Sequence, residues 1–398
     1  MPSGGSFPRD LLAQPTDARL AYFTAKVVAH PRLTAVHRAV REALNQPDGA
    51  SLILVYGPTG VGKTTLRLRL EQQLLAEALP DMQYDPDRVP VMAVEAVAAE
   101  SGQFNWKDYY LRALAVLDEP LMAHKITVTM PENFTPGGPT PARPLLKRSA
   151  SAAEFRWVLE QCLHRRRVAV CLVDEAQHLK RLASGRRLLD QMDTLKSLAA
   201  LTGTVHVLVG TYELLGMTNL SAQLSRRSVE IHFGRYRADL AEDRLAFKSV
   251  VLTFQRQLPL AEEPDLVGCW EALYEGSLGC VGVLKSWLNR SLAYAMAHDA
   301  VTLTRRHLER QAAPTRTLVN LAREVAEGEG ALREDPKVRD ELRMLLGLGA
   351  PPAEKRNRDA TGSAAHSAAG AAPRRPTGRV IQRRPTRDPV GEARPVGH

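Results

Sequence analysis

A glycine-rich turn between a strand pattern and a helix pattern constrains this chain more than any other feature. Residues 51–56 form an apolar run with β-branched members, which predicts a buried strand. Leu66, Leu70 and Leu74 then recur every four residues, as on one face of a helix. Between these patterns lies the sequence Gly-Pro-Thr-Gly-Val-Gly-Lys-Thr, residues 57–64. This order predicts an α/β fold with a phosphate-binding loop at the end of its first strand.

The residue types of the turn explain this prediction. Glycines let successive backbone N–H groups turn toward a phosphate, and the helix that follows presents the positive end of its dipole. A lysine reaches the β- and γ-phosphates, and a hydroxyl coordinates magnesium. We therefore expect ATP and Mg²⁺ as cofactors. The predicted nucleotide-binding residues of the turn are Gly57, Pro58, Thr59, Gly60, Val61, Gly62, Lys63, Thr64 and Thr65, with Thr64 also a metal ligand.

A second apolar run, residues 168–173, ends in two acids, Asp174 and Glu175. A continuous apolar strand suits a sheet that is covered on both faces. Ligands of open α/β sheets bind at the carboxyl ends of the strands. We expect Asp174 to hold the magnesium and to contact the nucleotide, and Glu175 to orient and deprotonate the attacking water.

Further candidates follow along the chain. Strand 205–209 leads to Thr211, which is predicted to sense the γ-phosphate from between the two motif-bearing strands; the alternative is a helix-capping hydroxyl. Arg226 or Arg227 could act as an arginine finger that reaches the γ-phosphate bound by a neighbouring subunit. Alternatively, both are solvated surface charges. Lys285, near the start of a later helix, could contact the nucleotide from above, or be an ordinary surface lysine.

The organisation of the chain is that of an α/β unit followed by helices. Strand and helix patterns alternate as far as about residue 238, which predicts a parallel sheet with helices on both faces. Later segments carry helical spacing, and the composition shifts after Ala350 to Ala, Gly, Pro, Ser and Arg. The expected parts are a flexible leader (1–16), a nucleotide-binding domain (17–238), an all-helical lid (239–348) and a disordered basic tail (349–398).

Charge and composition narrow the class of protein. Of the formal net charge of +9, the segment from Pro351 onward contributes +6, with ten Lys and Arg against four Asp and Glu. Such a tail attracts polyanions, most plausibly nucleic acid, although it could serve only for solubility. The sequence holds no run of apolar residues of membrane-spanning length and no secretory signal pattern. Its four cysteines lack metal-ligand spacing, so we expect reduced thiols and a cytoplasmic protein.

The order of these motifs resembles that of AAA+ ATPases. Within that class, Val-Asp-Glu-Ala-Gln-His-Leu at residues 173–179 and Val-Gly-Thr-Tyr-Glu at 209–213 resemble the TniB/TnsC group of transposition regulators. The similarity runs from about residue 30 to residue 311. Lys285 stands where many AAA+ proteins have arginine, and the basic tail is an addition to the pattern.

The resemblance implies a homo-oligomeric ring or helical filament, with about six or seven subunits per turn, that forms on double-stranded DNA when ATP is bound. Its implied partners are a transposase and a TniQ-like target-selection protein. The resemblance implies no association with a membrane. Hydrolysis would be slow and would serve as a switch. In such assemblies, residues between the second strand and the Asp-Glu strand touch DNA, so Lys107, Lys147 and Arg148 are candidates; each could equally be a solvated charge.

Two other functions remain open at this point. ExeA-type secretion ATPases, which act on protein partners, share the Asp-Glu-Ala-Gln-His segment. A small-molecule kinase of the phosphate-loop class is the third possibility, although a helical lid and the paired arginines at 226–227 would then lack a purpose.

Overall fold

The protein is described here from a computed structural model. It describes residues 6–46, 50–98, 104–117, 151–180, 186–218, 228–333 and 336–348. The chain divides into two compact units, Met1–Arg333 and Glu334–His398, and each is described by itself.

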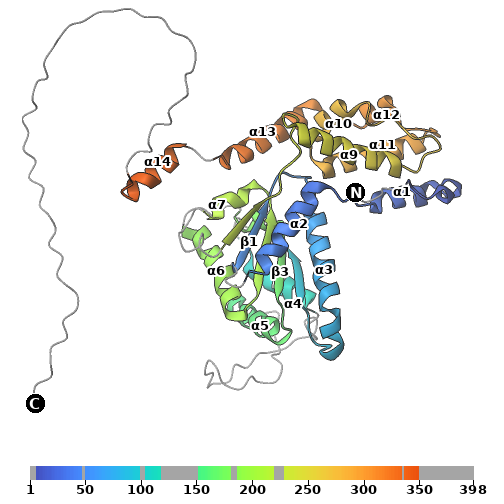
Figure 1. Cartoon of the computed structure of the whole chain (residues 1–398). Coiled ribbons are helices and arrows are strands. Elements are labelled where there is room, and N and C mark those ends of the chain that lie inside the picture. Colours follow the sequence, from blue (N-terminus) through green and yellow to red (C-terminus); the bar gives the residue numbers. More distant parts are fainter. Residues whose placement is uncertain are drawn as a thin grey trace, which may run out of the picture. The chain divides into compact units, whose positions relative to one another are not determined.

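A five-stranded parallel sheet forms the centre of the first unit (Figure 1). Its strands lie in the spatial order β2-β3-β4-β1-β5. Strand β4 therefore lies between β1, which leads into the glycine turn, and β3, which ends in the acids, as the sequence predicts. The strands are β1 (Leu52–Tyr56), β2 (Val91–Glu95), β3 (Val170–Asp174), β4 (Val205–Gly210) and β5 (Ser228–His232).

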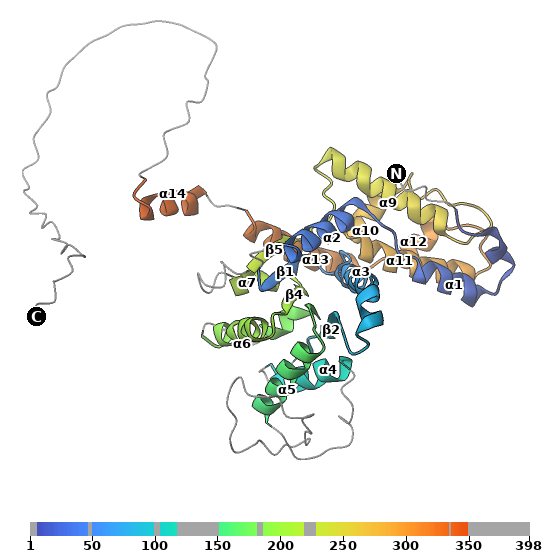
Figure 2. The ribbon, with the colours of Figure 1, turned by 60° about the horizontal axis from the view of Figure 1, so that its bottom comes forward.

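Two hydrophobic cores cover the two faces of this sheet. On one face, alternate residues such as Ile53 and Val55 pack against α2 (Pro31–Leu44) and α3 (Lys63–Tyr84). On the other face, Leu52 and Leu54 contribute to the core built from α4, α5 and α6. Figure 2 shows these helices on their two sides of the sheet. The helices of the second face are α4 (Trp106–Val116), α5 (Ala152–Arg165) and α6 (Arg186–Thr202).

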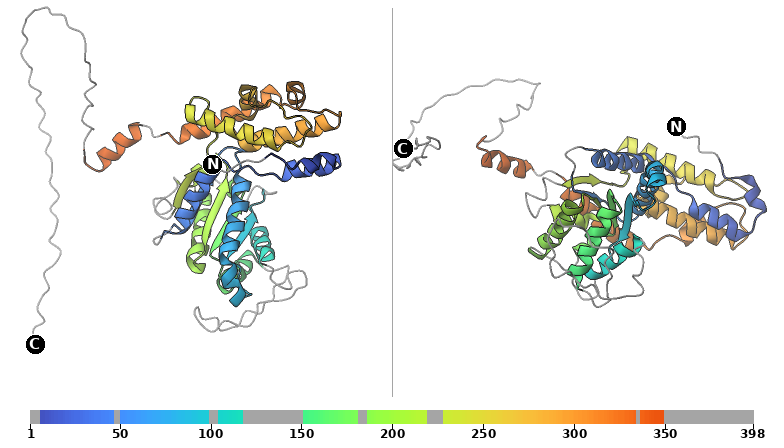
Figure 3. Two further views of the ribbon diagram at one scale, coloured as in Figure 1. Left: turned by 45° about the vertical axis from the view of Figure 1, so that its right-hand side comes forward. Right: turned by 90° about the horizontal axis from the view of Figure 1, so that it is seen from below.

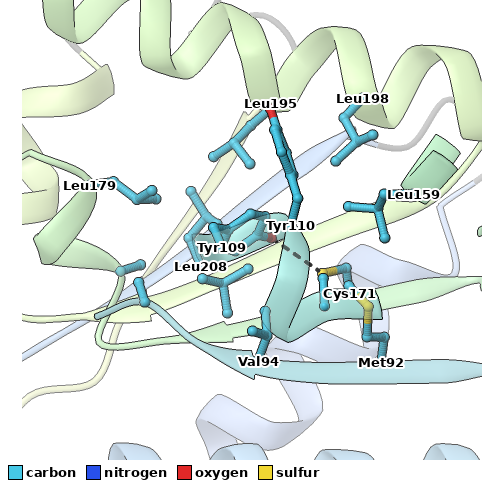
Figure 4. Close-up of a cluster of buried hydrophobic side chains, with 14 of the residues drawn as sticks. Met92, Val94, Tyr109, Tyr110, Leu159, Cys171, Leu179, Leu195, Leu198 and Leu208 are labelled. Carbon is cyan, nitrogen blue, oxygen red and sulfur yellow. Dashed lines mark hydrogen bonds between the residues drawn. The ribbon is translucent and has the colours of Figure 1, made fainter. Parts of the chain in front are cut away.

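The aromatic residues of α4 are core residues. Tyr109 and Tyr110 are buried among leucines of α5, α6 and β4, and the Tyr109 hydroxyl lies 3.9 Å from the Cys171 sulfur (Figure 4). Burial raises the pKa of the Cys171 thiol to about 12, which keeps it protonated and unreactive. These rings therefore form part of the core rather than a base-stacking surface.

Local sequence sets several element ends. Pro31 occupies the first turn of α2, and the His30 ring nitrogen accepts a hydrogen bond from the Leu33 N–H. Ser151 and Glu154 form a capping box at the start of α5. Short helical turns follow β3 and β4: η3 (Ala176–Leu179) and η4 (Tyr212–Leu214), the latter continuing into α7 (Leu215–Thr218).

A helical bundle, here called the lid bundle, forms a third core. Its members are α1 (Thr16–Ala25), α9 (Ala241–Gln257), α10 (Trp270–Ser277), α11 (Val281–Met296) and α12 (Arg305–Arg310). Figure 3 shows α1, in dark blue, beside the yellow and orange helices. Phe23 of α1 is fully buried in this core. The N-terminal helix therefore packs with the lid, whereas the sequence-based division assigned it to the nucleotide-binding domain.

Two more differences concern the ends of the lid. The predicted flexible leader contains a short helix, η1 (Arg9–Ala13), and the Phe7 N–H donates to the Arg256 carbonyl of α9 at 3.1 Å. Helix α13 (Thr315–Ala331) belongs to the first unit, while α14 (Pro336–Leu345) belongs to the second, so the predicted lid (239–348) crosses a unit boundary. Among the described residues, no helix combines the length and apolar character needed to cross a membrane.

Candidate functional site

The glycine turn positions Lys63 at the carboxyl edge of the sheet. Gly62 has a φ of 115°, which favours glycine, and precedes the first residue of α3. The Lys63 Nζ donates to the carbonyl oxygens of Gly57 and Pro58 at 3.0 and 2.9 Å. Its side chain is thus folded back over the turn, with the residue 8% exposed. Burial lowers the pKa of Lys63, and the negative charges of Glu175 and other nearby acids oppose this shift.

The acids of β3 lie next to this turn. Asp174 is buried, and its Oδ2 atom accepts a hydrogen bond from the Arg67 guanidinium at 3.3 Å. Its Oδ1 atom accepts from the Glu175 N–H at 3.0 Å. Glu175 itself has a φ of 51°, in the left-handed region that is uncommon for residues other than glycine. Such backbone conformations recur at functional sites, where the surrounding structure holds them.

One polar cavity joins the predicted nucleotide and metal residues. Its volume is about 230 Å³. The residues that line it include Thr64, Asp174, Glu175 and Glu95; Glu95 is the register partner of Asp174 on β2. Hydroxyl and carboxylate oxygens are the ligands that Mg²⁺ prefers. With Lys63 beside them, these residues fit a magnesium-bound triphosphate, and Thr64 and Asp174 are the residues that would hold the metal.

The other residues of the turn contribute mainly through their backbone. The Val61 side chain is buried (2% exposed) in the core between the sheet and helices α2 and α3. Gly60 has a φ of 76° and accepts two hydrogen bonds at its carbonyl, from the N–H groups of Gly282 and Val283 at 2.7 and 3.2 Å. The lid bundle therefore meets the turn through the first backbone amides of α11.

Thr211 occupies the predicted place at the end of β4. Gly210 pairs with Tyr56 of β1, so Thr211 follows the strand that separates the glycine turn from the acids. The Thr211 hydroxyl is buried and has no hydrogen-bond partner among the described residues. A buried hydroxyl without a partner is costly, and a phosphate oxygen or water would satisfy it.

Lys285 lies elsewhere than predicted. Its Nζ donates to the Phe23 carbonyl of α1 and sits 3.3 Å from the centroid of the Phe23 ring. Burial lowers the pKa of Lys285 to about 7. Its side chain points into the lid bundle, because α1 packs against α11 there. In this position it does not make the expected contact with the nucleotide from above.

Helix α13 approaches the same edge of the sheet. The Tyr212 ring lies so close to Gly328 of α13 that a side chain at Gly328 would collide with it. Glu329 forms a two-pronged ion pair with Arg235, with N–O distances of 2.9 and 3.2 Å. Arg235 also donates to the Tyr274 hydroxyl of α10 at 3.0 Å. Contacts between α13 and the edge of the sheet were not predicted from the sequence.

Two more polar residues of the site were missed. Arg67 lies one helical turn after Lys63, so its place beside the phosphate turn was open to prediction from helical spacing. Gln177 donates to the Glu175 carboxylate and accepts from the Thr211 N–H. No signal in the sequence links Gln177 to Thr211, because this contact depends on β3 and β4 being neighbours.

Four of the predicted residues lie outside the described residues: Arg226, Arg227, Lys147 and Arg148. Lys107 is described; it is partly buried on α4, with its Nζ 5.5 Å from the centroid of the Phe155 ring. Its predicted contact with DNA stays a prediction.

A family model matches the part of the chain that carries the glycine turn and the acids of β3. Residues 45–218 match the family described as AAA domain. A search of curated proteins finds no match. Solved structures with a similar fold include the ORC2 protein of Aeropyrum pernix (14% identity, 82% of this chain and 79% of that chain, TM-score 0.46). Cdc6p of Pyrobaculum aerophilum is similar over 73% of this chain and 69% of its own (14% identity, TM-score 0.45).

A Walker-type ATPase of Pyrococcus abyssi is likewise similar (16% identity, 78% of this chain and 75% of that chain, TM-score 0.42). The fold is a P-loop type of parallel α/β sheet with helices on both faces, and its residues 45–218 match the AAA domain family.

Proposed function

We propose that this protein is an ATP-dependent AAA+ regulator of DNA transposition. It oligomerises on duplex target DNA, links a target-selection protein to the transposase, and disassembles when ATP is hydrolysed. The observation that carries the ATPase part is the convergence of Thr64, Asp174 and Glu175 at one cavity, with the charge of Lys63 close to both acids. The resemblance of the segments at 173–179 and 209–213 to the TniB/TnsC ATPases supports the transposition part.

The residues of the cavity divide the work of hydrolysis. When ATP binds, the Lys63 ammonium gives up its hydrogen bonds to the turn carbonyls and donates to the β- and γ-phosphate oxygens. These oxygens are negatively charged and therefore form stronger hydrogen bonds with it. Thr64 and Asp174 would hold magnesium, which would neutralise negative charge on the phosphates. Glu175 accepts a proton from water as the water oxygen attacks the γ-phosphorus and the bond to the β-phosphate oxygen breaks. The Thr211 hydroxyl donates toward the phosphate or the attacking water.

The remaining parts of the proposal concern assembly. Arg226 or Arg227 reaches the γ-phosphate of a neighbouring subunit, so that nucleotide state controls the contact between copies. Lys107, Lys147 and Arg148 contact the DNA backbone, which gives binding that depends on salt rather than on base sequence. The basic segment after Pro351 binds DNA or the transposase.

Electron microscopy and sedimentation with a DNA duplex test the proposal. Wild-type protein with ATP and magnesium forms ordered particles on duplex DNA. Lys63→Ala forms none because it cannot bind the phosphates, and Glu175→Gln forms particles that persist because hydrolysis is blocked. DNA-bound assemblies that form equally well in Lys63→Ala would contradict the proposal.

The same samples distinguish the other functions. Particles that are identical with and without DNA would favour an ExeA-like ATPase that acts on proteins. A phosphorylated small molecule in place of free phosphate would indicate a kinase.

A further inference from the structure

Gln177 links the ends of two neighbouring strands at the catalytic edge. It follows β3 within the turn η3, and its side chain spans from Glu175 to the residue after β4. We propose that Gln177 is a positioning residue: it holds the Glu175 carboxylate over the end of β4 and so orients the base that hydrolysis needs. This inference rests on the proposed ATPase function and adds a residue to it.

The donor end of Gln177 binds the catalytic carboxylate. Its Nε2 group donates to the Oε2 atom of Glu175. The left-handed backbone at Glu175 and the hydrogen bond from the His178 N–H to the Glu175 carbonyl, at 3.0 Å, fix the turn that brings the two side chains together. The carboxylate is therefore held from the side of η3 rather than left free to rotate.

The acceptor end binds the strand next to it. The Oε1 atom of Gln177 accepts a hydrogen bond from the Thr211 N–H at 3.2 Å. A Cβ atom at Gly210 would lie 2.5 Å from this oxygen, so glycine at this position makes room for the amide. Only one orientation of the amide satisfies both ends, because a carboxylate can only accept and a backbone N–H can only donate.

Both anchors of this bridge are well fixed. Gln177 is 7% exposed, which limits its alternative rotamers. Next to Thr211, the Tyr212 hydroxyl lies 2.9 Å from the His232 Nε2 atom on β5. The Lys180 Nζ donates to the Glu213 carbonyl at 3.1 Å, which forms a second link between the segments after β3 and β4.

The position of β4 explains why this bridge orients the base productively. Strand β4 lies between β3 and β1, and β1 leads into the glycine turn. A carboxylate drawn toward the end of β4 is drawn toward the side on which Lys63 holds the phosphates. The water that attacks the γ-phosphate must lie between these two groups. Gln177 therefore acts through Glu175 and need not contact the nucleotide.

Steady-state hydrolysis and equilibrium ATP binding of two variants of the full-length chain test this role. Gln177→Leu removes both ends of the bridge. Gln177→Glu keeps an acceptor for the Thr211 N–H and loses the donor to Glu175. Both variants should lower kcat by at least about tenfold, while the Kd for ATP changes by less than about twofold. In a Glu175→Gln background, Gln177→Leu should have no further effect, because the two residues act as one unit.

Lys180→Met is the matched control. It cuts the second link between the same two segments and leaves Glu175 untouched, so kcat should stay within about twofold of the wild type. An unchanged kcat in Gln177→Leu and Gln177→Glu would overturn the proposal. A fall in the residual rate of Glu175→Gln when Gln177→Leu is added would also overturn it. So would a loss of ATP affinity and thermal stability in Gln177→Leu that accounts for the whole fall in kcat. If Glu175→Gln hydrolysed ATP at the wild-type rate, the ATPase mechanism itself would fall, whatever the Gln177 variants do.

Discussion

Two lysines that follow glycines near helix starts, Lys63 in α3 and Lys285 in α11, have opposite surroundings. Lys63 lies on two backbone carbonyls with Glu175 and Asp174 nearby, whereas Lys285 lies against the Phe23 ring and carbonyl. Burial lowers the pKa of both, but for Lys63 nearby acids oppose the shift, and for Lys285 burial is the whole cause. A buried lysine therefore indicates a phosphate site only where acids and turned backbone surround it.

Removal of the Lys63 charge should have the largest effect. Lys63→Ala deletes a charged donor to two phosphates, each such bond contributing about 1.5–3 kcal/mol, so the Kd for ATP should rise by at least about 100-fold. Calorimetric titration with ATP and magnesium measures this change. Lys285→Met, titrated in parallel, should bind ATP as the wild type does; equal losses in the two variants would erase the distinction between the lysines.

Removal of the Glu175 charge should affect turnover and leave binding intact. Glu175→Gln keeps the size of the side chain and loses the general base, which lowers kcat by roughly 10² to 10⁴-fold. ATP binding should be retained, since the carboxylate contributes no phosphate contact. Phosphate release measures the first effect, and a wild-type rate in the variant would remove Glu175 from the mechanism.

An ion pair between α13 and the residues after β5 provides a prediction about stability. Glu329→Gln replaces the charge-assisted pair with Arg235 by neutral hydrogen bonds. Both side chains are about one-fifth exposed, so we expect a loss of about 1 kcal/mol in the free energy of unfolding. Denaturant titration measures this loss. ATP affinity should be unchanged, and a large loss of affinity instead would place α13 within the nucleotide site.

The burial of Lys285 also predicts a pH dependence of stability. Its pKa is about 7 in the folded protein and near the ordinary 10.5 in the unfolded chain. Between these values the unfolded chain binds the extra proton, so this residue's contribution to stability becomes more favourable as the pH rises from about 7 to about 10. Melting temperatures of wild type and Lys285→Met across this range should show the wild type gaining relative to the variant. A constant difference would contradict the burial of the ammonium group.

The sequence predicted the parts of the site that local pattern determines. The turn at Lys63, the acids after β3 and the threonine after β4 each follow an apolar strand, and the parallel arrangement brings strand ends to one edge. Helical spacing also predicted that the chain after about residue 238, which includes most of the lid bundle, folds as helices. It could not predict that α1 packs there, because Phe23 and Lys285 are 262 residues apart and meet only after the chain has folded.

The role of Gln177 likewise depends on a contact between segments that are distant in sequence. The neighbours of Gln177 in sequence define a motif, but its role depends on the Thr211 N–H, 34 residues away at the end of the adjacent strand β4. Gly210 is the sequence feature that reflects this contact, because any side chain at this position would collide with the Gln177 amide. Without the strand order, that glycine reads as an ordinary strand end.

The proposed function depends most on a cavity that binds ATP with magnesium. Calorimetric titration of ATP into Glu175→Gln, in magnesium and then in excess EDTA, tests this directly, because the variant does not consume its ligand. We expect saturable binding at one site per chain. Without magnesium, the affinity should fall at least about tenfold, because Thr64 and Asp174 then no longer hold a metal ion against the phosphates. No binding in magnesium buffer, or equal binding with EDTA, would contradict it.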